Sequence, residues 1–181
     1  MYDARVIADY IIGYYNENNG AVTNYKLQKI LYFLQAEFLV QKKKRLFDDE
    51  IVAMNFGPIV QNVFHLFKGF AHSSIVRTGA TFDKCFKEAS FDDSFPMRRF
   101  RDTFEKPHLL EEDRIIIDEM LERLREYSES ALTEITKNQA PWIRNYSKYE
   151  TRVIPTDEIY EYFSEDENKS KMEDKKKETE N

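Results

Sequence analysis

The segment that decides the fold is residues 23–45, which read T-N-Y-K-L-Q-K-I-L-Y-F-L-Q-A-E-F-L-V-Q-K-K-K-R. Its apolar residues recur at the three- and four-residue spacing of an α-helix and form one wide face. Thr23 or Asn24 can accept a hydrogen bond from a free backbone N–H group and so begin the helix. We therefore predict a long helix at the centre of the core. The residues on its apolar face are Leu27, Ile30, Leu31, Leu34, Phe38 and Leu39.

This helix is expected to end in four consecutive cations, Lys42, Lys43, Lys44 and Arg45. Positive side chains are favourable at the C-terminus of a helix, where the backbone dipole is negative. We favour this helix-end role. A nucleic-acid-binding arm is the alternative for such a run.

Other helical patterns lie on both sides of this segment and carry recognisable start signals. One stops at Asn18-Asn19-Gly20, and another spans residues 110–127 with three acids in its first turn. Asp3 is the expected cap of the first helix. The three remaining helical patterns are expected to begin at Ser130, at Pro141, which precedes Trp142, and at Thr156.

Three short apolar stretches predict strands, at residues 51–56, 74–78 and 151–154. Gly57 and Pro58 follow the first stretch, and Pro58 suits the first position of a helix, so we expect a strand that leads into a helix there. The predicted fold is mainly α (α+β). It is a compact bundle of six or seven helices around the central helix, with a small sheet of two or three short strands.

Composition narrows the class of protein. The chain has 181 residues, a net charge of −6 and a pI near 5.3, which argues against affinity gained mainly by neutralising nucleic-acid phosphates. The single cysteine, Cys85, rules out an internal disulfide, and no apolar stretch approaches the ~20 residues that span a membrane. We expect a soluble cytoplasmic protein with a folded domain over residues 1–163 and a disordered charged tail over residues 164–181.

A phenylalanine repeat interrupts the helical patterns within residues 80–107. Its members follow one another at alternating spacings of four and five residues, which fits short turns or a compact loop better than one helix. A local aromatic minicore is the interpretation we favour, and a partner-facing insertion is the alternative. The repeat consists of Phe82, Phe86, Phe91, Phe95, Phe100 and Phe104.

Residues suited to catalysis are few. The chain has three histidines, His65, His72 and His108, together with Cys85, and it lacks a glycine-rich phosphate-binding loop. The predicted end of a helix near Gly69 separates His65 from His72, so we do not expect them to form a metal site. We predict a protein that is not an enzyme and needs no metal or cofactor.

Two sets of residues are candidates for binding a partner. On the central helix, Tyr25, Gln28, Tyr32 and Gln35 form a stripe of side chains with apolar bodies and polar tips, and Lys29 lies beside it. Such a stripe suits either the centre of an interface or a buried layer whose polar groups satisfy one another, and the sequence does not choose between them. The second set, Arg98, Arg99 and Arg101 around Phe100, suits a contact with an acidic protein surface.

Three blocks of the sequence resemble one known family in the same order. Residues 25–35, Y-K-L-Q-K-I-L-Y-F-L-Q, resemble the K-L-Q-K-L-L-Y-F-A-Q helix of the SocA-like, or Panacea, antitoxin domain. Residues 46–60 resemble its L-F-D-D-x-I-x-A-W-x-x-G-P-V-V segment, and residues 130–142 resemble its S-x-x-L-x-x-x-T-H-x-x-x-P-W ending. The likeness extends from residue 5 to about residue 163. Its structural motif residues here are Leu27, Leu31, Gly57, Pro58, Pro141 and Trp142.

The resemblance implies a non-enzymatic antitoxin that neutralises a cognate protein toxin, by direct contact or by delivering it to an AAA+ protease. Met54, Gln61 and Lys137 depart from the family pattern, as does the phenylalanine repeat, and these departures bear on which toxin is bound. We expect direct binding, with the stripe as the contact surface and the repeat as the determinant of specificity. A proteolytic adaptor and a phage-associated nucleic-acid regulator are the alternatives.

Overall fold

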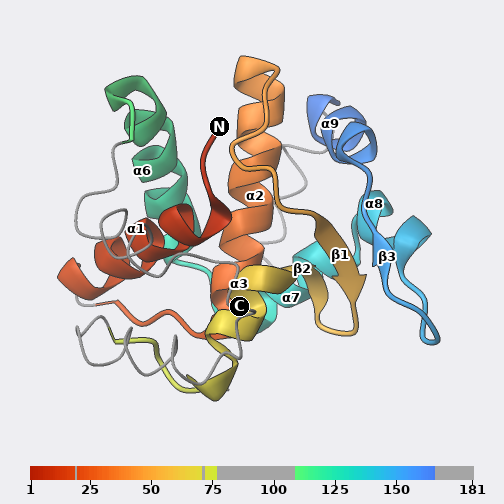
Figure 1. The fold of residues 1–181 in the computed structure, drawn as a ribbon, viewed down its shortest axis with the longest axis horizontal. Coiled ribbons are helices and arrows are strands. Elements are labelled where there is room, and N and C mark those ends of the chain that lie inside the picture. The colour runs from red at the N-terminus through yellow and green to blue at the C-terminus, as the bar shows by residue number, and fades with distance from the viewer. Residues whose placement is uncertain (19, 71, 77–108, 166–181) are drawn as a thin grey trace, which may run out of the picture.

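The computed structural model describes residues 1–18, 20–70, 72–76 and 109–165, and within them it confirms the predicted fold class. These parts of the chain form seven α-helices, one short 3-10 helix and three strands, arranged as in Figure 1. The elements are α1 (Ala4–Glu17), α2 (Asn24–Lys42), β1 (Ile51–Met54), β2 (Gly57–Val60), α3 (Gln61–Leu66), η1 (Lys68–Phe70), α6 (Glu111–Arg125), α7 (Glu129–Lys137), α8 (Ala140–Asn145), β3 (Arg152–Val153) and α9 (Thr156–Ser164).

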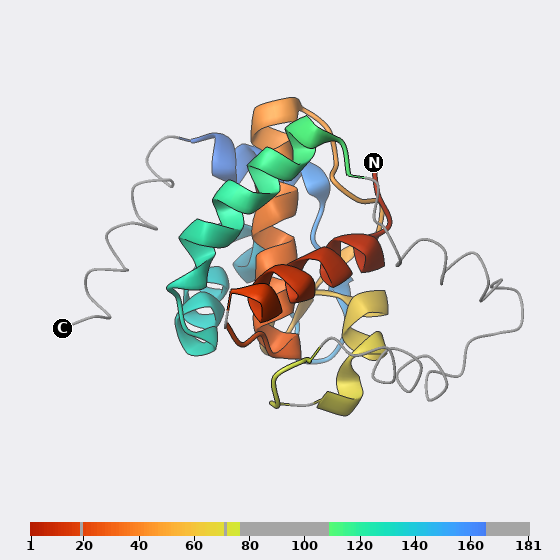
Figure 2. The same ribbon diagram turned by 90° about the vertical axis from the view of Figure 1, so that its left-hand side faces the viewer.

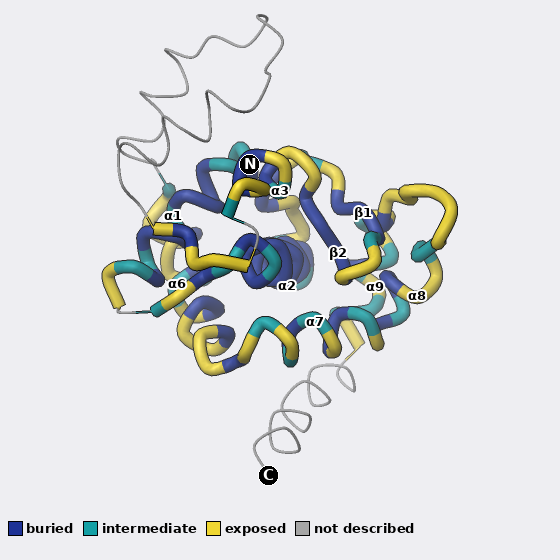
Figure 3. The backbone as a smooth tube through the Cα atoms, turned by 90° about the horizontal axis from the view of Figure 1, so that it is seen from below, coloured by how far each residue is buried: buried dark blue, intermediate teal, exposed yellow. Residues whose placement is uncertain are grey.

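Helix α2 is the predicted central helix, and the other elements surround it. Seen along its axis in Figure 3, α2 is ringed by α1, α6, α7, α9, α3 and the sheet. Thr23 caps it by accepting a hydrogen bond from the Lys26 N–H, and Leu27 and Leu31 are fully buried. Fourteen of its 19 residues are buried. The helix is therefore buried on all sides, whereas the sequence predicted burial of one wide apolar face.

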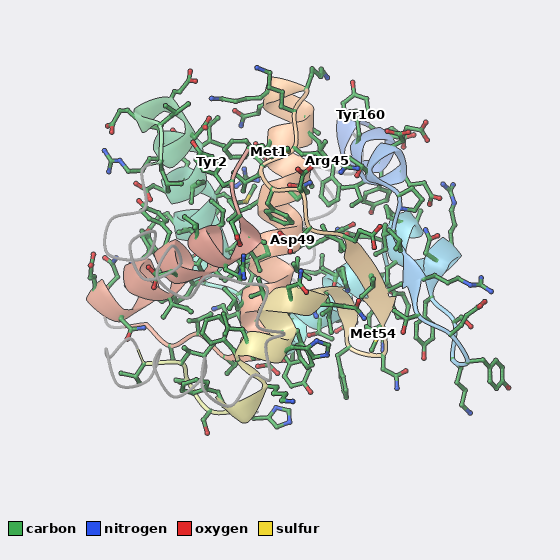
Figure 4. The ribbon with its side chains drawn as sticks, in the orientation of Figure 1. Met1, Tyr2, Arg45, Asp49, Met54 and Tyr160 are labelled. Atoms are coloured by element: carbon green, nitrogen blue, oxygen red, sulfur yellow. The ribbon has the colours of Figure 1, made fainter. Side chains whose placement is uncertain are left out.

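Helices α1 and α6 lie side by side at one edge of this ring (Figure 2) and are joined by tyrosine hydroxyls that donate to carboxylates. Asp3 begins α1 as predicted, because its carboxylate accepts from the Arg5 N–H. Each tyrosine to carboxylate distance is 2.6 Å, and Tyr2 is labelled in Figure 4. Tyr10 and Tyr14 of α1 pair with Asp118 and Glu122, and Tyr2, which precedes α1, pairs with Asp113.

The small sheet has the order β2-β1-β3 and is antiparallel throughout. Strands β1 and β2 form a tight hairpin in which Met54 pairs with Gly57 and Ile51 pairs with Val60. The prediction that Pro58 opens a helix is therefore wrong, because Gly57 and Pro58 belong to β2 and α3 begins at Gln61. Gly57 has a φ of 96°, a left-handed conformation that favours glycine and turns the chain back on itself.

Two other local predictions are also wrong. Residues 74–76, the described part of the predicted strand 74–78, do not form a strand. The Ile75 N–H donates to the Val22 carbonyl at 2.8 Å, the Ile75 carbonyl accepts from the Asn16 amide at 3.2 Å, and the Ile75 side chain is buried in the core. Ser128, not Ser130, caps α7, since its hydroxyl accepts from the Ala131 N–H. The predicted strand near residue 152 and the helix starting at Thr156 are confirmed.

Several predicted features lie outside the described residues. They are the phenylalanine repeat, the arginine cluster, Cys85, His108 and nearly all of the predicted tail. Among the helices that the structure describes, none is both long enough and apolar enough to cross a membrane.

Candidate functional site

The predicted stripe on α2 is mostly interior. Gln28, Lys29 and Tyr32 are fully buried, Gln35 is 2% exposed, and only Tyr25 reaches the surface. A partner that docks on the folded body therefore meets Tyr25 alone among these five side chains. The other four are buried, as in the buried-layer alternative, but their polar groups do not satisfy one another. Gln28, Lys29 and Gln35 bond to backbone groups of other segments, and the Tyr32 hydroxyl has no partner within the described residues.

Gln28 and Lys29 bind the free edge of strand β2. The Val60 N–H donates to Gln28 Oε1 at 2.9 Å, and Lys29 Nζ donates to the Pro58 carbonyl at 3.3 Å. Because β2 is an edge strand, these two side chains stand in for the backbone of a missing neighbouring strand. They thus attach the hairpin to α2.

The Lys29 ammonium lies in a tightly packed site. A Cβ atom placed on Gly57 would lie 2.9 Å from Lys29 Cε and 2.9 Å from the Thr136 hydroxyl, so the hairpin, α2 and α7 meet closely here. Burial lowers the pKa of Lys29 to about 7, because removing the ammonium from water disfavours its charged form. Glu129 opposes this shift and Lys137 adds to it.

Gln35 and Tyr32 also have interior roles. Gln35 Oε1 accepts from the Leu46 N–H at 3.0 Å and the Phe47 N–H at 3.2 Å, and Gln35 Nε2 donates to the Phe47 carbonyl, so this amide holds the chain that leaves α2. The Tyr32 ring packs against Phe33 and Phe163. Its buried hydroxyl has no hydrogen-bond partner within the described residues, and burial raises the pKa of Tyr32 well above its ordinary value.

Three of the four cations at the end of α2 contact groups of this same chain. Lys42 pairs with Asp113, and Lys43 Nζ donates to the Tyr160 hydroxyl at 2.6 Å. Arg45 donates to the Thr156 hydroxyl at 2.7 Å, and Figure 4 places Arg45 and Tyr160 on the side of α9. These side chains are held against α6 and α9, which argues against a nucleic-acid-binding arm formed by the run.

Pro141 and Trp142 are the two structural motif residues that follow α7, and Trp142 contacts the hairpin. Pro141 lies in the first turn of α8, as predicted, and Trp142 is buried. The Trp142 indole N–H donates to the Met54 carbonyl at 2.9 Å, and its ring stacks on Tyr146 at 4.5 Å. Figure 4 labels Met54 on the hairpin that this bond secures.

The surface around Tyr25 contains the strongest candidate site, a hollow of about 490 Å³ that we name the aromatic pocket. Its volume falls within the range typical of ligand-binding clefts. The residues come from α2, the turn of the hairpin, the segment after η1, and α7. They are Tyr25, Phe56, His72, Glu129, Ser130, Thr133, Glu134, Lys137 and Asn138.

One wall of the aromatic pocket consists of rings in mutual contact. The Tyr25 ring meets Phe56 edge-on, with centroids 5.1 Å apart, and stacks with the His72 imidazole at 5.2 Å. Phe64 supports Tyr25 from α3 at 5.6 Å. Phe56 is 53% exposed and the His72 side chain 77% exposed, so this wall presents aromatic surface to solvent.

The opposite wall is the polar face of α7. Thr23 donates a hydrogen bond to Glu129, whose other oxygen lies 4.0 Å from His72 Nδ1. Glu134 is exposed and makes no ion pair with any residue that the structure describes. Lys137 Nζ lies 5.3 Å from the centre of the Trp142 ring. The pocket therefore combines aromatic surface with two carboxylates and one ammonium.

Sequence reasoning found only Tyr25 of this site. Phe56 falls at the end of the predicted strand 51–56, and neither Phe56 nor His72 shares a periodic pattern with Tyr25. The exposure of Phe56 follows from its place in the turn of the β1–β2 hairpin, and the sequence did not predict that hairpin.

A second hollow, of about 380 Å³, lies between the chain after α2 and the start of α9, and four of its twelve lining residues are acidic: Asp48, Asp49, Glu50 and Asp157. Asp49 is already engaged there by Asn62 at 2.8 Å, and Asp48 by Arg45 at 3.7 Å. In the described ranges no group of three or more histidine, cysteine or acidic residues is arranged to hold a metal ion.

One of three comparisons with known proteins gave a match. Neither the curated proteins nor the solved structures gave a match. A family model described as "Antitoxin SocA-like, Panacea domain" matches residues 27–143, a range that contains most of α2, the hairpin, α7 and Trp142. The chain therefore belongs to the SocA-like antitoxin family with a Panacea domain.

Proposed function

We propose that this chain is the antitoxin of a toxin–antitoxin pair and neutralises its toxin by direct protein–protein contact, without catalysis. The observation that carries the proposal is the aromatic pocket. Exposed aromatic residues beside polar groups are typical of the energetic centre of protein interfaces. Family membership supports a toxin as the partner in general terms.

The surface around the pocket has the features that such an interface needs. Phe56 and Tyr25 supply aromatic area, while Ser130, Thr133 and Asn138 supply hydrogen-bonding groups at the border. Several pocket residues lie on α2, α7 and the hairpin, and hydrogen bonds of Lys29 and Gln28 join α2 to the hairpin. Preorganisation of this kind lowers the ordering cost of binding.

The two alternative functions have less support. For a nucleic-acid regulator, the cations Lys42 and Arg45 already contact Asp113 and Asp48. For a proteolytic adaptor, no described feature indicates a protease contact, and a protease-deficient host separates it from direct binding.

The test is co-expression with the product of a neighbouring gene that is toxic when expressed alone. We expect the wild-type chain to restore growth in a host that lacks AAA+ proteases. Phe56→Ala is expected to reduce that protection, whereas Ile115→Ala, which removes an exposed apolar residue of α6 outside the pocket, is the matched control. Protection that requires the proteases would favour the adaptor, and absence of any toxic neighbour would contradict the proposal.

A further inference from the structure

We infer that the aromatic pocket is built to receive an arginine side chain of a protein partner. This inference rests on the proposed function and names the chemistry of the contact. The pocket places exposed rings beside the carboxylate of Glu134, which makes no ion pair with a described residue, and arginine is a side chain that can bind both.

The aromatic wall suits a planar cation. Phe56, more than half exposed, and His72, still more exposed, present ring surface next to Tyr25. A guanidinium group stacks on such rings and is attracted by their electron-rich faces, while the apolar stem of arginine covers the remaining ring area.

The α7 wall suits a donor of several hydrogen bonds. Glu134 has no ion pair among the described residues, whereas Glu129 accepts from Thr23 through one oxygen and lies 4.0 Å from His72 Nδ1 through the other, so Glu134 is the expected partner of the guanidinium. Arginine has five N–H donors in a fixed plane and can serve both oxygens of a carboxylate, which the rounded lysine ammonium does less well.

The balance of charge favours a cation over an anion. The lining holds two carboxylates against one ammonium, that of Lys137, which lies over the Trp142 ring. The whole chain carries a net charge of −6, so its field attracts a basic partner. An acidic or wholly apolar partner group would leave Glu134 without a counter-charge on binding.

The direct test uses a defined probe, the blocked peptide acetyl-Gly-Arg-Gly-amide, titrated into the full ¹⁵N-labelled chain. We expect saturable NMR shifts of the Phe56, Thr133 and Glu134 amides with a Kd on the order of 1–10 mM. The matched peptide with citrulline, which keeps the shape of arginine without its charge, is expected to give no saturable shifts. Equal binding of the two peptides, or no saturation by either, would overturn the inference.

Variants of the chain locate the contact. Glu134→Gln is expected to weaken the arginine peptide at least threefold, and Glu119→Gln, which removes an exposed carboxylate of α6, to leave its affinity unchanged. Equal affinity of all three chains would overturn the inference. Amide spectra that superimpose away from the pocket verify that both variants fold.

Glu134→Arg links the contact to toxin neutralisation. We expect this charge reversal to abolish growth protection, because an arginine of the chain would repel that of the partner. If wild type and variant protect equally, the arginine assignment fails while the proposed function stands. If wild type gives no protection, the function fails and the peptide titration still decides the assignment. Self-association of the wild-type chain that Glu134→Arg abolishes would assign the pocket to a second copy and contradict a separate partner.

Discussion

Replacement of Lys29 by methionine should change how the stability of this protein depends on pH. The pKa of Lys29 is about 7 in the folded chain, against an ordinary value of 10.5, because the ammonium is fully buried. The two values differ by about 3.5, which corresponds to a charging cost of about 5 kcal/mol.

The direction follows from proton binding. Between pH 7 and 10.5 the unfolded chain holds a proton on Lys29 that the folded chain has released, so the folded state gains stability as pH rises through this range. Below pH 7 both states are protonated and the full cost is present. From pH 7.5 to 9.5 the gain due to Lys29 amounts to about 2 kcal/mol, since each pH unit contributes about 1.4 kcal/mol at most.

The assay is urea unfolding, followed by the fluorescence of Trp142, at pH values from 7.5 to 9.5. We expect the stability of Lys29→Met relative to wild type to fall by about 2 kcal/mol across this range, whatever the cost of losing the bond to the Pro58 carbonyl. Lys44→Met, at an exposed position, is the control and should differ from wild type by a constant amount. A constant difference for Lys29→Met as well would refute the reasoning.

Three further substitutions test the interior contacts of the fold, each by the free energy of urea unfolding. Gly57→Ala should lower the free energy of unfolding by at least about 2 kcal/mol, because a Cβ atom is strained at a φ of 96° and would lie 2.9 Å from Lys29 Cε. A loss below about 0.5 kcal/mol would contradict this packing. Gln35→Ala should lose about 3 kcal/mol, since two buried N–H groups lose their acceptor, and unchanged stability would show that water replaces it. Tyr32→Phe should leave the free energy of unfolding unchanged or raise it by about 1 kcal/mol, because the Tyr32 hydroxyl is buried without a described partner. A clear loss of stability would reveal a hydrogen bond to this hydroxyl.

The helices were predictable because their signals are local. Asp3 and Thr23 cap α1 and α2 within three residues of their own positions, and the acids that begin α6 lie in its first turn. The central position of α2 followed from its high density of apolar residues. The hairpin was not predictable in the same way, because Gly57-Pro58 suits both a helix start and an edge strand, and only pairing with β1 decides between them.

The candidate site was less predictable for a physical reason. Polar residues on a helix usually indicate its solvent face, but Gln28 finds its partner at Val60 and Gln35 finds its partners in the chain after α2. Such distant partners leave no periodic signal in the sequence. The aromatic pocket likewise combines Tyr25, Phe56 and His72 from three separate segments, so only the fold brings them together.

The most direct test of the account is a calorimetric titration of the purified toxin with the purified chain. We expect wild type to bind with a Kd below about 1 μM, and Phe56→Ala to bind at least about tenfold more weakly, as for an aromatic residue at the energetic centre of an interface. Ile115→Ala should bind like wild type. Equal affinity of the Phe56→Ala and wild-type chains, or no binding by either, would contradict neutralisation through the aromatic pocket.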